Sequence, residues 1–218
     1  LMVCMESLST QLSESRSDLI LARICDSTAL DGRHINFPGS SDGSTALYTS
    51  TADSYGNINL VTTNALEDYS DIKAAALKLK KMKRKDGGFI VVRPRVLLCP
   101  AELEETAWTI LNSIYCPTTG GATANPMIAN PYGPNGIWGN NRPVIIAHPQ
   151  VETFAGANST WFLGDPTRQF FERQLWAPEI MARLNGADPM RDIVGAWVGS
   201  YCSDVGALSN KYFVKCTA

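Results

Sequence analysis

The sequence predicts an α+β fold, on three observations. Apolar residues recur at steps of three and four from Leu66 to Met82, which is the spacing of a helix with one buried face. Between residues 26 and 63, short stretches alternate apolar and polar residues and are separated by turn signals, which indicates strands. The chain then closes on a strand pattern at 212–216, which we expect to join a sheet that has already formed.

Charge is distributed unevenly along the 218 residues, although the net charge of −2 is close to neutral. Residues 1–72 hold ten acids against three bases, whereas residues 73–95 hold nine bases and one acid. The bases have two interpretations. They are either the solvated end of a helix, where cations favour the macrodipole, or a surface that faces nucleic acid or an acidic neighbour.

The first 63 residues are not expected to build a core of their own, because residues 1–25 are too short and residues 26–63 have little apolar content. Residues 1–25 show helical spacing and are expected to form a short amphipathic arm. Residues 26–63 are expected to form a long β-hairpin or extended loop, with strand pieces at 33–37, 45–49 and 57–61. An isolated hairpin is marginal in water, so this element needs a partner, and another subunit is a candidate.

A long helix is expected over residues 64–85, and its flanking signals are clear. Asn64 is the expected N-cap, Glu67 completes a capping box, and the glycines at 87 and 88 end the helix. Strands at 89–92 and 96–99 follow, and Pro100 then opens a second helix with acids in its first turn.

No charged residue lies between Glu105 and Arg142, and this stretch is rich in Gly, Asn and Pro. It is interpreted either as a linker or as a loop that packs against copies of itself, since interface cores are depleted of charge. The rest of the chain predicts a short buried strand at 144–147, a strand at 160–163, a helix at 166–176 and strands at 193–201 and 212–216.

The sequence shows no catalytic, cofactor or metal motif. The two histidines, His34 and His148, have no nucleophile or carboxylate near them in sequence, and the usual hydrolase, zinc and phosphate-loop patterns are missing. The six cysteines have no CxxC spacing, so neither a metal site nor a disulfide framework is expected. No apolar run reaches membrane-spanning length and no signal peptide is recognisable. A chain that starts at Leu1 is either proteolytically matured or one part of a longer protein.

The order of these elements resembles a known family. The resemblance lies in the following segments, in this order: RPRVLLCPAELEETAWTILNS after the basic segment, the Gly/Asn/Pro-rich loop, RPVIIAHPQ, WFLGDP and the final KYFVKCTA. Together they resemble the major capsid protein of tailed double-stranded DNA bacteriophages, and most of all the Mu-like major head subunit group. The resemblance covers most of residues 26–218 and rests on the order of the segments.

The resemblance implies a Hong Kong ninety-seven type shell fold. Residues 1–25 would be the N-terminal arm, 26–63 the extended loop and 89–192 the axial domain, while 64–88 and 193–218 would form a peripheral domain with the spine helix. It implies a virion protein, assembled in the bacterial host cytoplasm, whose hexamers and pentamers build an icosahedral head around double-stranded DNA. The first lysine is Lys73, so a lysine crosslink from the extended loop is not expected.

The implied partners are other copies of the chain, with portal, scaffold, maturation protease, decoration proteins and non-specifically bound DNA as further candidates. The basic segment is expected to meet the acidic region of a neighbour rather than DNA. Two alternatives stay open: the shell of a cargo-enclosing compartment of the same fold, and a small soluble enzyme using His148. The residues expected at subunit contacts are Ile35, Phe37, Leu47, Tyr48, Lys80, Lys81, Lys83, Arg84, Tyr132 and Trp138.

Overall fold

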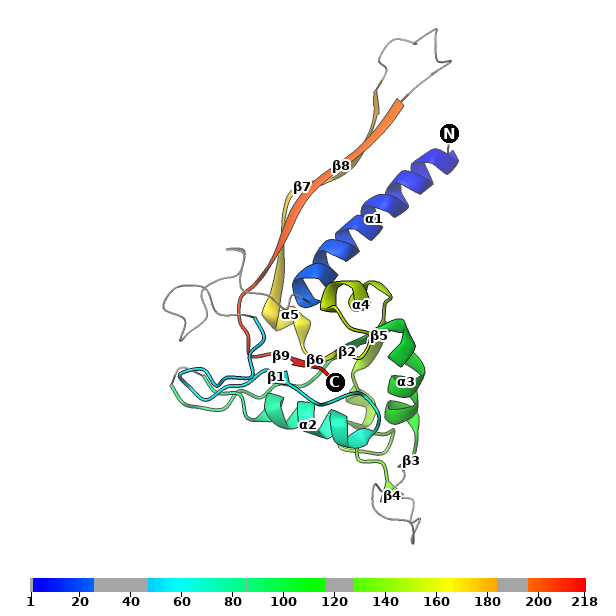
Figure 1. Ribbon diagram of the computed structural model, residues 1–218. Coiled ribbons are helices and arrows are strands. Elements are labelled where there is room, and N and C mark those ends of the chain that lie inside the picture. The colour runs from blue at the N-terminus through cyan, green and yellow to red at the C-terminus, as the bar shows by residue number, and fades with distance from the viewer. Residues whose placement is uncertain (1, 26–46, 85, 117–127, 184–195) are drawn as a thin grey trace.

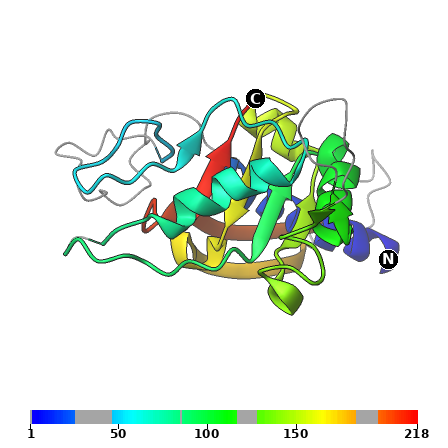
Figure 2. The ribbon, with the colours of Figure 1, turned by 90° about the horizontal axis from the view of Figure 1, so that it is seen from below.

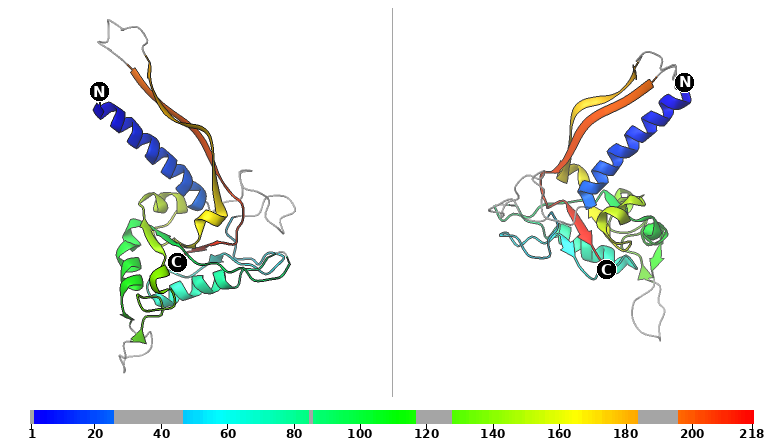
Figure 3. Two further views of the ribbon diagram at one scale, coloured as in Figure 1. Left: turned by 180° about the vertical axis from the view of Figure 1, so that it is seen from behind. Right: turned by 45° about the horizontal axis from the view of Figure 1, so that its top comes forward.

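The computed structural model describes residues 2–25, 47–84, 86–116, 128–183 and 196–218. It contains a sheet-based body, from which a long helix and a long β-hairpin project on the same side (Figures 1 and 3). The helices are α1 (Met2–Cys25), α2 (Tyr69–Lys80), α3 (Glu104–Asn112), α4 (Gln150–Ala155) and α5 (Pro166–Gln169), with 3-10 turns at Ala101–Leu103 and Gly139–Asn141. The strands are β1 (Leu60–Val61), β2 (Val96–Cys99), β3 (Tyr115–Cys116), β4 (Ile128–Ala129), β5 (Val144–Ala147), β6 (Trp161–Gly164), β7 (Phe170–Arg183), β8 (Ala196–Ala207) and β9 (Phe213–Cys216).

The body is built on a five-stranded mixed sheet in the order β1-β9-β6-β2-β5. The pairs β1/β9 and β2/β5 are parallel, while β6 is antiparallel to both β9 and β2. The predicted strands at 96–99, 160–163 and 212–216 are therefore confirmed, and they form the three central positions. The last strand does return to the sheet, next to β1 and β6, which both lie far earlier in the sequence.

Strand alternation gives the sheet two buried faces. Leu97, Trp161 and Val214 lie in a core with α2 and α3 on one side. Their neighbours Leu98 and Phe162 face the opposite side, where the last turns of α1 and the helix α4 cover them. Figure 2 shows α2 crossing in front of the sheet and α3 beside it. The body thus has a helix, sheet, helix layering.

The projecting part, which we call the arm, consists of α1 and the antiparallel hairpin β7–β8. The described part of the hairpin pairs Phe170 with Ala207 at its root and Arg183 with Ala196 at its far end. α1 runs beside it, tied by a two-bond ion pair between Arg16 and Glu172 and by a 2.9 Å hydrogen bond between the hydroxyls of Ser15 and Tyr201. The predicted helix at 166–176 is wrong: helix ends at Gln169, and the following residues form β7.

The root of the arm is fixed where β6 ends. Gly164 has φ 158°, and a Cβ there would lie 2.2 Å from the carbonyl oxygen of Tyr212. The next residue, Asp165, caps α5 by accepting a hydrogen bond from the backbone N–H of Thr167 at 3.2 Å. Gly164 and Asp165 together explain the Gly-Asp-Pro sequence, because the glycine permits the close approach of β9 and the aspartate begins the helix.

The helix α2 is shorter than the sequence predicts. Its N-cap is Asp68, which forms a capping box with Asp71, and its C-cap is Lys81. Asn64 is held by the sheet instead, because its carbonyl accepts the Trp161 indole N–H at 2.8 Å and its N–H donates to Thr217 at 2.7 Å. The expected cap at Asn64 and the 64–85 helix are corrected accordingly.

Two further expectations need correction. β5 is an edge strand with exposed Val144 and Ile146, not a buried strand. Residues 89–92 form no strand beyond a single bridge between Lys83 and Phe89. The predicted piece at 33–37 and the first two residues of 45–49 lie outside the described residues. Residues 47–49 form no strand, and of 57–61 only Leu60–Val61 is a strand. One core joins α2, β2, α3 and β6.

Candidate assembly surfaces

The basic residues gather on an excursion of the chain between α2 and β2, which we call the finger (81–95, of which 85 is not described). The chain reverses at Gly87, whose φ of 81° suits glycine, and the Arg84 N–H donates to the Gly88 carbonyl at 2.7 Å. The Ile90 N–H donates to the Met82 carbonyl at 2.8 Å. These bonds hold the two sides of the finger together at its turn.

The returning side of the finger alternates between buried and exposed residues. Ile90 and Val92 point into the body, while Phe89 is 62% exposed and Val91 is 79% exposed. Arg93 is exposed on the same outward side. The Lys83 ammonium lies 5.8 Å from the centre of the Phe89 ring. The outer surface of the finger therefore combines apolar and cationic side chains.

A side-chain amide fixes the base of the finger. The Asn57 Oδ1 atom accepts a hydrogen bond from the backbone N–H of Lys83 at 2.6 Å, and the Asn57 Nδ2 atom donates one to the Lys83 carbonyl at 3.2 Å. The Asn57 side-chain amide therefore makes the two hydrogen bonds with Lys83 that the backbone of a paired strand residue would make. Asp53 holds it in turn, since its Oδ2 accepts from the Asn57 Nδ2 at 2.9 Å. The buried Lys211 also donates to the Lys83 carbonyl, at 2.9 Å.

The loop before β5 packs mainly within the chain. Tyr132 is buried, its ring centre lies 4.6 Å from that of Trp138, and burial raises the pKa of its hydroxyl. The Asn130 side chain anchors the loop to the end of α3, donating to the Ile110 carbonyl at 2.6 Å. Trp138 is partly buried and lines a cavity of about 370 Å³ between α2 and residues 89–94 of the finger.

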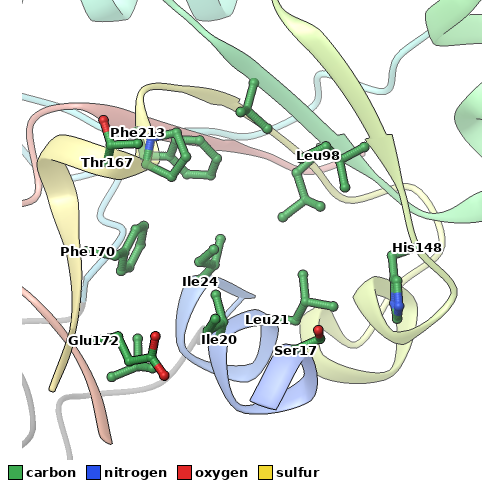
Figure 4. A pocket seen from close by; sticks show the side chains of 14 residues that line it. Ser17, Ile20, Leu21, Ile24, Leu98, His148, Thr167, Phe170, Glu172 and Phe213 are labelled. Atoms are coloured by element: carbon green, nitrogen blue, oxygen red, sulfur yellow. The ribbon is translucent and has the colours of Figure 1, made fainter. Parts of the chain in front are cut away.

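A larger apolar cavity of about 480 Å³ lies between the last turns of α1, the sheet and the root of the arm (Figure 4). Its wall is mostly aliphatic and aromatic, with His148 and Glu172 at opposite sides in the view. The Glu172 carboxylate is held by Arg16, which lowers its pKa, and the His148 Nδ1 accepts the Gln150 N–H at 3.2 Å. The Ser17 hydroxyl donates to the Ser13 carbonyl. These polar groups bond to the protein around them rather than to one another.

Burial keeps several cysteines in the thiol form. It raises the pKa of Cys25, Cys99 and Cys216 to about 12 in each case. Thiolate is the form that reacts and binds metals, so these three side chains act as small apolar core residues. Across the described ranges, no group of three His, Cys, Asp or Glu side chains could hold a metal ion. Within the same ranges, no helix has the length and apolar content needed to cross a membrane.

The structure places the predicted contact residues in three groups. Lys80, Lys81 and Arg84 are exposed, and Lys83 is half-buried, so the basic group does form one surface around the finger. Leu47, Tyr48 and Tyr132 are buried in the chain's own core, and Trp138 packs partly buried against it. Ile35 and Phe37 lie outside the described residues. In the described conformation, Leu47 and Tyr48 have no surface to offer a neighbour.

Sequence reasoning missed two features of these surfaces. The role of Asn57 carries no signal, because the Tyr55-Gly56-Asn57 turn has the same composition as many surface turns. The second feature is Trp108, which is 61% exposed on α3. Its position three and four residues after Glu105 and Glu104 places all three on one helix face, which the spacing alone could have shown.

The comparisons with known proteins add a family. Residues 29–201 match a family described as phage capsid protein, and this match spans most of the chain. No curated protein matches it. The match confirms the expected class at a coarse level: a structural protein of a virion, of the kind whose copies associate into a shell. This chain belongs to a family of phage capsid proteins.

Proposed function

We propose that this chain is the major capsid protein of a tailed double-stranded DNA phage, with a Hong Kong ninety-seven type fold close to the Mu-like head subunits. Its copies assemble into hexamers and pentamers of an icosahedral head that encloses the genome. Portal, scaffold, maturation protease and decoration proteins are the further partners this function implies. The family match supports the shell role, and the shape of the chain supports the finer assignment.

The observation that carries the proposal is the arm. β7 and β8 run 14 and 12 residues and project from the body together with α1 (Figure 1). Of the described elements, α1 is the main one that packs along this ribbon, and a two-stranded ribbon is marginal in water without a further surface to lie on. In a shell, the adjacent subunits supply that surface.

The arm also changes the domain assignment. The fold requires a long helix that runs beside the strands of a peripheral domain. α1, with 24 residues beside β7–β8, fits this role better than α2, which has 12 residues and packs on the body sheet. We therefore assign the arm to the peripheral domain and the sheet with α2 and α3 to the axial domain.

Negative-stain electron microscopy with light scattering on the purified chain at moderate salt tests the proposal. Closed particles or rings of five and six subunits are the expected result. A monodisperse monomer over a wide range of concentration, both alone and with the other head proteins of the same phage, would overturn it. Particles filled with an enzyme instead of a genome in the native host would instead indicate a cargo-enclosing compartment.

A further inference from the structure

We propose that the finger of one copy docks on the exposed face of α3 of the next copy, in a head-to-tail contact that builds the capsomer ring. This inference rests on the proposed shell function and specifies the surfaces that the assembly uses. The three observations behind it are the composition of the finger, the composition of the α3 face and the positions of the two.

The finger is a cationic surface with apolar side chains at its centre. Residues 80–95 contain seven bases and one acid. Phe89 and Val91 are the most exposed apolar residues on it, and Arg84 and Arg93 flank them. No backbone group of residues 91–93 bonds to another backbone group in the described part of the chain. Such a segment retains both side chains and backbone groups for a partner.

The α3 face has the complementary composition. Glu104 and Glu105 are exposed in its first turn, and Trp108 lies one turn further along the same face. The preceding turn adds the exposed Glu102. The sequence has no lysine or arginine from residue 96 to residue 141, so no cation of this segment competes for these carboxylates. An exposed tryptophan beside carboxylates suits a partner with apolar and cationic groups.

The two surfaces lie at opposite ends of the body. In Figures 1 and 2, the finger extends beyond one end of α2, while α3 lies at the other end. One copy therefore cannot satisfy its own α3 face with its own finger. Two different patches at opposite ends of one molecule form a heterologous contact, which closes into a ring when the rotation between copies allows it.

DNA is the other macromolecule that a cationic surface attracts. Phosphates are bound by lysine and arginine and gain nothing from Phe89 and Val91, the most exposed apolar side chains of the finger. The α3 face provides an apolar partner for them in Trp108, together with the opposite charge. The protein partner therefore accounts for more of the observed surface.

Charge reversal on each side provides the test. The finger variant is Arg84→Glu with Arg93→Glu, and the helix variant is Glu104→Lys with Glu105→Lys. None of these four side chains belongs to the Asn57 and Lys211 bonds that fix the finger. Each variant alone is expected to raise the concentration needed for capsomer formation by about tenfold or more, because like charges then face each other. Unchanged circular dichroism and melting temperature show that each variant is folded.

Mixing the two variants restores both contacts, since each reversed surface then meets a reversed partner. Copies must alternate around the ring, so the mixture is expected to form rings with an even number of subunits and no pentamers. The control is Lys73→Glu, which reverses an exposed base on α2 outside both surfaces and is expected to assemble normally.

The outcomes separate this inference from the shell function. Failure of the wild-type chain to assemble would contradict the function itself. Normal assembly of the wild type and of each variant alone would overturn the docking contact while leaving the function intact. Normal assembly of the finger variant together with loss of encapsidated DNA would show that the finger binds nucleic acid instead.

Discussion

Gly164 shows how one residue can fix the junction between the body and the arm. Its neighbours on β9 approach so closely that only a hydrogen fits, and Asp165 immediately afterwards begins the helix that leads into the hairpin. Asp165 also lies 3.7 Å from Arg95 at the end of the finger and 3.6 Å from Arg168. The finger, the sheet and the root of the arm therefore meet at two adjacent residues.

Gly164→Ala is expected to destabilise the chain by about 3 kcal/mol or more, because the added Cβ must displace the backbone of β9. Urea unfolding followed by circular dichroism measures the change. The matched control is Gly88→Ala, where the nearest atom is an aspartate side chain at 3.2 Å and φ is not positive. That variant is expected within about 1 kcal/mol of wild type. Equal stability of both variants would contradict the described packing of β6 against β9.

Single residues also mark where sequence reasoning worked and where it failed. The exposed bases of the finger followed from charge, since an unpaired lysine or arginine almost never lies fully buried. Leu47 and Tyr48 were expected at an interface because the surrounding sequence is polar. They are buried instead, against Phe162, which is distant in sequence, with ring centres 5.6 Å apart for the Tyr48 pair. Local composition cannot show a contact between residues that lie so far apart in the sequence.

Among the elements, the arm is held together in part by polar contacts between α1 and the hairpin. The Arg16–Glu172 ion pair and the Ser15–Tyr201 hydrogen bond join α1 to both strands of the hairpin. The hydrogen bond from Arg16 is the main cause that lowers the pKa of Glu172, and Glu172 in turn raises the pKa of Arg16. The position of α1 on the hairpin is therefore coupled to the charge of one carboxylate.

The ion pair predicts a pH dependence. Because the folded pKa of Glu172 is lowered, its stabilisation is fully present above the ordinary glutamate pKa of about 4.3 and is lost as the pH falls through the lower folded pKa. Wild type is therefore expected to be more stable than Glu172→Gln at pH 7, and the difference should shrink as the pH falls below about 4.3 and vanish only below the lowered folded pKa. Urea unfolding of both proteins from pH 7 to pH 3 measures it. A difference independent of pH would contradict the ion pair.

The secondary structure was predicted best where apolar runs are short and buried. The strands β2, β6 and β9 and the helix after Pro100 follow directly from such runs and from proline and acid signals. The 166–176 prediction failed because its apolar residues fit helical spacing, whereas the pairing with β8 more than 20 residues later decides the structure. The α2 cap failed because Asn64 and Asp68 both carry cap signals, and the sheet engages Asn64.

At the scale of the whole molecule, charge is separated along the body. The finger concentrates the bases at one end and α3 presents acids at the other, so each copy has two poles. This polarity follows from the sequence only in part. The basic segment was evident, but its partner was expected in residues 1–72, and the position of α3 across the body depends on the sheet order.

Assembly is accordingly expected to weaken with salt. Raising the ionic strength from about 0.1 M to 1 M shortens the screening length from about 10 Å to about 3 Å, which weakens contacts between exposed charges. When the protein is diluted, capsomers should stay assembled down to a lower protein concentration at low salt than at high salt, as measured by light scattering. Assembly that is indifferent to salt would indicate contacts made by apolar surfaces alone.

The order of strands in the body has a consequence for synthesis. β9 lies between β1 and β6, yet the ribosome makes it after every other described strand. Until β9 emerges, β1 has no strand to pair with and β6 has a partner on one edge only. A nascent chain therefore lacks a complete body until its last described strand has been translated, and until then the unpaired edges of β1 and β6 leave it prone to aggregate with neighbouring chains on the same polysome.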